Sequence, residues 1–520
     1  MSTINRRDLL KAGAGAALLS ALDAAFLGDA IAQEQPKRGG TLSYAQLSAN
    51  RRSAGPNNSR HPYFIVDANT KQIWSTPTWV NPELGLELEI ATKLEPADGS
   101  LKVWDMTLRE GVMFHDMTEM TAADAVASFN YHRQNAPFAR QITKVEQIGK
   151  YAVRFTLEAG NAEFGYVLAE YNSPIMKAAP LETIGLDGIG TGAFKIVQSD
   201  PNRLMILERF ESYWRKGLPH LDRIEIHNRE GQQESALNGL RSGQFDAVMN
   251  IDGRAALQFQ NDPNFEIETA RGGYSFVIQL PKHPGSPFLD KRVRQAFAYA
   301  IDREAIVRVA YSGRFGWIGN DSHLMVTDAA FVPRAGGRDV AKAKQLLAEA
   351  GHPNGINLGT LYWSPQLPEA GRYFQVLQQS VKDAGITLTI EERPNDGYIQ
   401  FRTGDNDLSK GNFHKFAMTA VGSRNPGISL FRMRAAFVES GHWRGPEHDK
   451  YLALYNQAMV TPDAAKRKAI YAEMQAILHE EVPAILPAGG NTLMVKRKHM
   501  RNMPYHPQIW SIRYEEIWRA

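Results

Sequence analysis

The stretch ESALNGLRSGQFDAVMN (Glu234–Asn250) joins two hydrophobic patterns of different period. Its first part has the period of a helix and ends near Gly243, where a residue without a Cβ takes the left-handed cap conformation at little cost. The part that follows, from Phe245 to Met249, is typical of a strand. A helix that leads directly into a strand is the repeating unit of an α/β fold.

The same alternation of helices and strands continues through most of the chain. Thr121, with Asp124 three residues later, has the spacing of a capping box, and Thr461 followed by Pro462 predicts another helix start. Expected helices cover residues 121–134, 339–351 and 461–481, and expected strands cover residues 151–158, 204–210, 275–280 and 386–392. The sequence therefore predicts an α/β architecture.

Length and composition limit the class of protein further. A chain of 520 residues is longer than one hydrophobic core usually serves, so more than one domain is expected. The formal net charge of +3 gives no argument for nucleic acid or an anionic membrane. The chain has no cysteine, which excludes disulfides, thiolate metal sites and a cysteine nucleophile.

The N-terminus has the pattern of an export signal. Arg6 and Arg7 precede an uncharged run from Ala12 to Leu22, which is too short to cross a bilayer, and Ala30-Ile31-Ala32 offers a cleavage site. These residues resemble the twin-arginine signal, which directs folded proteins across a membrane. We expect residues 1–32 to be a signal peptide and the mature protein to be periplasmic.

The motifs that usually indicate catalysis or a cofactor are incomplete. GLDGIGTGAFKIV (residues 185–197) is rich in glycine, but it opens a strand pattern rather than a helix, so it favours a tight turn over a dinucleotide site. None of the fourteen histidines has the spacing of a zinc helix, and Ser275 lacks the second glycine of a nucleophile elbow. No cofactor, metal or catalytic residue is predicted.

Several segments in order along the chain resemble one family. They are LKVWDMTLREGVMFHD (residues 101–116), GIGTGAFKIV (188–197), ALNGLRSGQFDAV (236–248), SPFLDKRVRQAFAYAIDREAIV (286–307) and DVAKAKQLLAEAG (339–351). Together they are similar to the extracellular solute-binding proteins of ATP-binding-cassette importers for peptides, nickel chelates and related solutes. The resemblance extends over nearly the whole mature chain.

The resemblance implies a two-lobed periplasmic-binding-protein fold of the class II type, with a ligand cleft between the lobes and an extra subdomain in the first. The expected limits are 33–275 for lobe I, about 65–190 for its subdomain, 276–492 for lobe II, and 493–520 for the return to lobe I. The implied function is capture of a peptide-like or other small organic solute by lobe closure and delivery to the membrane permease. A monomer without catalytic activity is expected; the alternative is an exported enzyme, such as a hydrolase with dispersed catalytic residues.

One departure from the family concerns the ligand. Peptide-binding members commonly carry an acidic residue shortly before an Asp-Pro or Glu-Pro pair. The matching stretch here, MTAVGSRNPGIS (residues 418–429), contains no acid. Gly422 or Ser423 occupies the place of the acid, and Arg424 and Asn425 precede Pro426. The Arg424 guanidinium suits a carboxylate or another anionic group, although a solvated loop arginine is the alternative. The identity of the solute stays open.

The other candidate ligand residues follow from position and resemblance. Trp363 and Trp443 stand at strand or loop ends, where either binding or packing is expected, and Tyr274 precedes the expected crossover. Asn320 and Asp321 lie in GWIGNDSH (residues 316–323), and Asp321 is the nearest available acid to replace the missing one. With Arg424 and Asn425 they form the predicted ligand-binding set.

Overall fold

The computed structural model describes residues 34–47, 71–185, 187–200, 203–229, 231–395, 397–403, 415–433, 443–503 and 505–520. The chain divides into Met1–Lys37 and a compact unit, Arg38–Ala520, and the following concerns the second of these. The predicted signal peptide and residues 48–70 lie outside the described residues.

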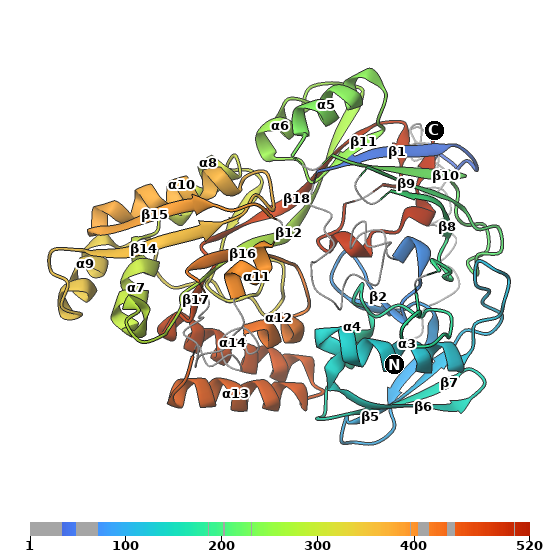
Figure 1. Cartoon of the computed structure of the whole chain (residues 1–520), viewed down its shortest axis with the longest axis horizontal. Coiled ribbons are helices and arrows are strands. Elements are labelled where there is room, and N and C mark those ends of the chain that lie inside the picture. The colour runs from blue at the N-terminus through green and yellow to red at the C-terminus, as the bar shows by residue number, and fades with distance from the viewer. Residues whose placement is uncertain are drawn as a thin grey trace, which may run out of the picture. The chain divides into compact units, whose positions relative to one another are not determined.

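One large mixed sheet connects the two halves of this unit (Figure 1). Its main path has the order β15-β14-β16-β12-β18-β11-β1-β10-β9-β8, with β13 and β17 paired to β18 and β12. The strands are β1 (Thr41–Gln46), β8 (Phe194–Asp200), β9 (Leu204–Arg209), β10 (Arg223–Asn228), β11 (Ala247–Met249), β12 (Phe265–Gln279), β13 (Gly316–Ile318), β14 (Ile356–Trp363), β15 (Ile386–Glu392), β16 (Ala417–Gly422), β17 (Ala484–Ile485) and β18 (Ala488–Arg497).

The antiparallel strands β12 and β18 run from one half of the sheet to the other. The register of this pair shifts between Ala270 and Tyr274, and from Tyr274 onward β12 also pairs with β16. Gly272 lies at the shift with φ of +71°, and a Cβ there would come within 2.4 Å of the Thr327 hydroxyl oxygen. The expected lobe limits, 275/276 and 492/493, fall inside these two strands; they remain a prediction.

Lobe I is built around β1 and β8–β11, and the C-terminal end of the chain packs back into its core. Its core contains Tyr44 and Ile226 together with Tyr514 from the end of the chain, and the Tyr514 hydroxyl lies 3.1 Å from that of Tyr44. The opening helix–strand prediction is confirmed, with shorter limits: α5 (Gln233–Ser242) ends at Gly243, whose φ is +88°, and β11 follows. Helix α6 (Gly253–Leu257) packs nearby.

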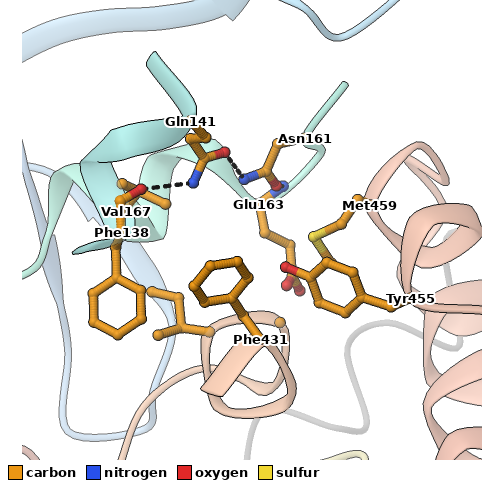
Figure 2. A pocket seen from close by; sticks show the side chains of 10 residues that line it. Phe138, Gln141, Asn161, Glu163, Val167, Phe431, Tyr455 and Met459 are labelled. Atoms are coloured by element: carbon orange, nitrogen blue, oxygen red, sulfur yellow. Dashed lines mark hydrogen bonds between the residues drawn. The ribbon is translucent and has the colours of Figure 1, made fainter. Parts of the chain in front are cut away.

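The subdomain is a separate four-stranded antiparallel sheet with helices on it. The strand order is β4 (Ala91–Pro96), β5 (Val103–Leu108), β7 (Ala152–Leu157), β6 (Ile142–Gly149), and α3 (Ala122–Asn135) and α4 (Phe164–Leu168) complete it; the short strands β2 (Thr78–Val80) and β3 (Leu86–Leu88) precede it. The predicted helix start is confirmed, since the backbone N–H of Thr121 donates to Asp124 Oδ2 at 2.7 Å. Figure 2 shows where this subdomain meets the helices of lobe II.

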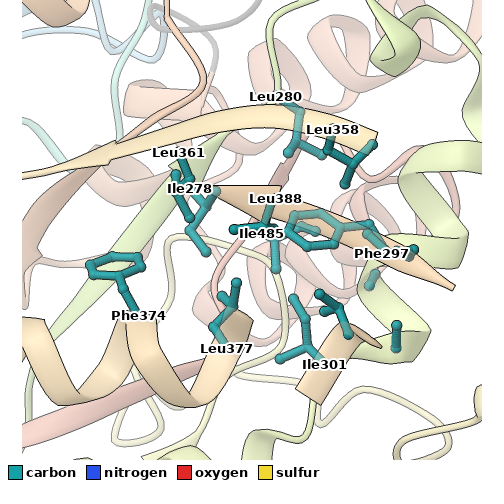
Figure 3. Packing of buried hydrophobic residues seen from close by; sticks show 14 of the residues in the cluster. Ile278, Leu280, Phe297, Ile301, Leu358, Leu361, Phe374, Leu377, Leu388 and Ile485 are labelled. Carbon is teal, nitrogen blue, oxygen red and sulfur yellow. The ribbon is translucent and has the colours of Figure 1, made fainter. Parts of the chain in front are cut away.

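Lobe II packs helices against β14–β16. Side chains such as Ile278, Leu361, Phe374 and Ile485 form its core (Figure 3). The helices are α7 (Lys291–Ala300), α8 (Arg303–Ala310), α9 (Val340–Glu349), α10 (Ala370–Val381), α11 (Tyr398–Thr403), α12 (Pro426–Met433), α13 (Pro446–Met459) and α14 (Ala464–Glu481).

The expected start of the last helix is wrong by two residues. Helix α14 begins after Asp463, whose carboxylate accepts a hydrogen bond from the Lys466 backbone N–H at 2.8 Å. An aspartate is at least as good a cap as threonine. Thr461 instead donates its hydroxyl to the Gln457 carbonyl, at the end of the preceding helix.

Candidate functional site

Arg424 lies buried at the junction of the two lobes. It follows the last residue of β16 by two positions and precedes α12, and its side chain is 4% exposed. Its Nε donates to Glu170 Oε2 at 3.1 Å, and Glu170, just after α4 of the subdomain, is equally buried. The alternative of a solvated loop arginine is therefore wrong for this residue. Pairing with Glu170 is what makes burial of the guanidinium tolerable.

An aromatic ring lies against the guanidinium. The Arg424 Cζ atom is 4.4 Å from the centre of the Trp510 ring, and the ring centre of Tyr171 lies 5.6 Å from that of Trp510. A Cβ on Gly422 would come within 3.2 Å of the indole, so this glycine lets the ring approach the strand. Three segments that are distant in sequence thus form one cation–ring–carboxylate group.

Three buried polar atoms, on residues of this group or next to them in sequence, have no hydrogen-bond partner within the described ranges. They are the hydroxyl of Ser423, the indole N–H of Trp510 and the side-chain oxygen of Asn172. Ser423 is 0% exposed and Trp510 is 4% exposed. Because buried polar groups are nearly always paired, these three atoms are open to hydrogen bonds with water or with a bound molecule.

Two more predicted residues lie beside Arg424. Tyr274 pairs in register with Gly422 on the neighbouring strand. Asn425 accepts a hydrogen bond from the backbone N–H of Ile428 at 3.1 Å and donates from Nδ2 to Glu163 Oε2 at 2.8 Å. The structure thus brings Arg424 and Asn425 together, with Asn425 facing the subdomain through these contacts. Tyr274 joins this region through its backbone, and its ring packs against Tyr311 with ring centres 6.2 Å apart.

Asp321 lies elsewhere, inside lobe II, in a network of two arginines. It is 0% exposed and accepts hydrogen bonds from Arg303 Nη2 at 2.7 Å, from Arg334 Nη1 at 2.8 Å and from the Leu486 backbone N–H at 2.9 Å. Burial acts to raise the pKa of Asp321, but the charges of Arg303 and Arg334 outweigh it and hold that pKa below its usual range. These contacts favour a structural role; a role toward the solute stays a prediction.

The remaining predicted residues, Asn320, Trp363 and Trp443, contact other side chains and backbone groups of lobe II. Asn320 donates to the Val332 carbonyl and to Gln475, both within lobe II. Trp363 stacks on Phe374 with ring centres 6.1 Å apart. Trp443 is 3% exposed and packs on Tyr451 at 5.4 Å. For each of the two tryptophans these contacts favour packing over binding.

Glu170, Tyr171 and Trp510 are the residues that the sequence did not predict. Glu170 and Arg424 are 254 positions apart, so no local spacing connects them. A signal existed only in general form: an arginine that enters a lobe junction needs an acidic partner, and the subdomain stretch from residue 157 to 176 carries several acids.

Comparison with known proteins defines the class. The family model of bacterial extracellular solute-binding proteins, family 5, matches residues 86–434, which is more than half of the 520-residue chain. This chain belongs to that family. Its α/β fold, with two lobes, is the fold of the family.

Individual relatives are distant. The glutathione-binding protein GsiB of Escherichia coli O1:K1 / APEC is 26% identical over 447 residues, covering 81% of this chain and 84% of GsiB. Among solved structures, DppA from Helicobacter pylori in complex with the peptide STSA has a TM-score of 0.77 at 20% identity, covering 93% of this chain and 98% of DppA. The PBP AgaA from A. tumefacien R10, in complex with agropinic acid, has a TM-score of 0.75 at 21% identity, covering 92% and 99%.

Membership of this family establishes the general function of the chain. The chain is the extracytoplasmic solute-binding component of an ATP-binding-cassette importer, and it delivers a small solute to the membrane permease. Members of the family bind their solutes without transforming them, and the comparisons give no support to the alternative of an exported hydrolase.

Proposed function

We propose that this chain is a periplasmic, monomeric receptor for a peptide-like or other small organic solute that carries a carboxylate. The single observation behind this proposal is the group formed by Arg424, Trp510 and Glu170 at the lobe junction. It offers a cation, a ring face and nearby polar atoms that lack partners among the described residues. Such a combination of apolar surface with a few polar groups is typical of small-molecule sites.

The chemistry of Arg424 supports a carboxylate. One edge of its guanidinium is used by Glu170 through Nε, and Nη1 is 3.4 Å from the Gly422 carbonyl. Nη2 has no hydrogen bond to any residue in the described part of the chain. A planar guanidinium accommodates a second carboxylate on its free edge, and Glu170 keeps the cation neutralised before the solute arrives.

The relatives' ligands agree with this chemistry. One relative is named for glutathione, and two structural neighbours were solved with a peptide and with agropinic acid. Each of these ligands has at least one carboxylate. Since the identities are low, these names support the class of solute and not a particular compound.

Closure requires a hinge, which we place where β12 and β18 cross between the lobes. Gly272 and Gly273 lie at the register shift in β12, and in β18 Gly490 and Gly489 pair with the next two residues, Tyr274 and Ser275. Small residues at the ends of paired segments absorb dihedral changes with little strain. The proposed lobe limits are those predicted from the sequence.

Thermal unfolding in the presence of candidate solutes tests this function. A true ligand stabilises the protein by RT ln(1 + [L]/Kd), about 2.7 kcal/mol at a hundredfold excess over Kd. We expect at least one of glutathione, short peptides and opine-type acids to raise the melting temperature. The matched amides, which lack the carboxylate, should do so much less. A hit among sugars, with none among the acids, contradicts the proposed solute class.

The twin-arginine route is tested separately. Replacing Arg6 and Arg7 together by lysine should leave the precursor in the cytoplasm, because the arginine pair is what the translocase recognises. Fractionation and immunoblotting measure the periplasmic share of the protein. Replacing Lys11 by arginine serves as the control, because it leaves the pair intact. Normal export of the double-lysine variant contradicts this route.

A further inference from the structure

The subdomain meets lobe II a second time, around Glu163. Its carboxylate Oε2 accepts hydrogen bonds from Asn425 Nδ2 and from the Tyr471 hydroxyl, each at 2.8 Å. Oε1 lies 3.4 Å from Arg467 Nε. Figure 2 shows the side chain of Glu163 extending from the subdomain toward Phe431 and Tyr455. One subdomain carboxylate therefore contacts three separate residues of lobe II.

Apolar contacts surround this carboxylate. Ile428 of α12 is only 6% exposed and belongs to the hydrophobic core of the subdomain, although it comes from lobe II. Phe431, one turn later, lies with its ring centre 6.0 Å from that of Phe138. The Ala162 backbone N–H also donates to the Met459 carbonyl at 2.7 Å. The contact therefore combines buried apolar surface with hydrogen bonds to Glu163 and to the Met459 carbonyl, as stable interfaces do.

Gly427 makes the contact possible. A Cβ at this position would lie 2.1 Å from Glu163 Oε2, well inside van der Waals contact. Gly427 stands in the first turn of α12, and its φ lies outside the left-handed region, so alanine is compatible with its backbone. Alanine is also the better helix former. A methyl group at 427 therefore displaces the Glu163 carboxylate from its partners Asn425 and Tyr471, which weakens the docked arrangement and leaves the helix itself intact.

We propose that the residues Glu163, Asn425, Gly427, Ile428 and Tyr471 form an interlobe clasp that holds the subdomain on lobe II before any solute binds. Each of these contacts joins two groups of the protein itself, so the clasp biases the protein toward its closed form in the empty state. Every solute then gains affinity, because less of its binding energy is used for closure. This inference uses the closure of the two lobes and is independent of which solute is bound.

Distance measurement in solute-free protein tests the clasp. Because the chain has no cysteine, Ile148→Cys and Leu289→Cys introduce the only two labelling sites; the residues are 47% and 52% exposed, one in the subdomain and one in lobe II. The protein is unfolded and refolded to remove bound solute, labelled with a dye pair, and measured by single-molecule energy transfer. The parent should populate mainly the short-distance state.

Gly427→Ala should raise the ratio of long-distance to short-distance molecules at least tenfold. The matched control is Gly337→Ala, where a Cβ meets nothing within 4 Å and φ is again outside the left-handed region. Glu163→Ala provides a second variant from the subdomain side and should shift the ratio in the same direction. Circular dichroism checks that the variants are folded.

The clasp is overturned if the empty parent is mainly in the long-distance state. It is equally overturned if either Gly427→Ala or Glu163→Ala gives the same ratio as Gly337→Ala. Because no solute is present, neither result depends on the proposed carboxylate site.

Discussion

Replacing Asp321 with asparagine is expected to lower the free energy of unfolding by about 3–5 kcal/mol, the cost of removing one partner from a buried ion pair. Arg303 and Arg334 are each 8% exposed, and both direct a guanidinium at this carboxylate. Asparagine keeps the size of the side chain and tolerates the φ of +60° at this position, so the substitution removes the charge and one acceptor oxygen without changing the shape.

The control is the same substitution at Asp383. This carboxylate also pairs with an arginine, Arg338 at 2.7 Å, but its side chain is 64% exposed. Exposed pairs contribute about 0–1 kcal/mol. Urea unfolding of both variants measures the difference. A loss for Asp321→Asn no greater than that for Asp383→Asn would show that the buried network does not hold lobe II together.

The second large effect is expected at Arg424. Arg424→Ala should weaken binding of a carboxylate-bearing solute by about 1.5–3 kcal/mol, or roughly 10- to 150-fold, the scale of a hydrogen bond to a charged group. It also leaves the buried carboxylate of Glu170 without its cation, which destabilises the closed form by itself. The single variant therefore mixes two effects.

A double variant separates them. In Arg424→Ala/Glu170→Ala both charges are absent, so no buried carboxylate is left unpaired. If Arg424 binds the solute directly, calorimetry should show that the double variant still binds weakly. Recovery of the parental affinity in the double variant would mean that Arg424 serves only to neutralise Glu170, and the proposed carboxylate site would be wrong.

The features predicted correctly from the sequence are mainly those set by local physics. The α/β alternation, the stop of α5 at Gly243 and the capping of α3 by Thr121 and Asp124 each depend on residues a few positions apart. Arg424 was singled out because it stands next to the position where the resembling family carries an acid, and its role toward the solute stays a prediction. In each case the informative signal lies within one short segment.

The features that were missed depend on segments that are far apart. Asp321 was singled out as an available acid, but Arg303 and Arg334 engage it, and only the tertiary fold brings them together. Glu170 and Trp510 reach Arg424 from positions more than 80 residues away, so their sequence contexts gave no indication of a shared site. Periodicity predicts which face of an element is buried, but it does not identify what lies opposite that face.

Mass spectrometry of small molecules released from the purified mature protein by denaturation tests the central claim most directly. A receptor that closes around its solute retains it through purification. The expected result is one carboxylate-bearing compound, or a few related ones, released at up to one per chain, which rebinds to the refolded protein unchanged. Release of no compound, together with chemical conversion of an added candidate solute, would contradict a solute-binding protein of this family.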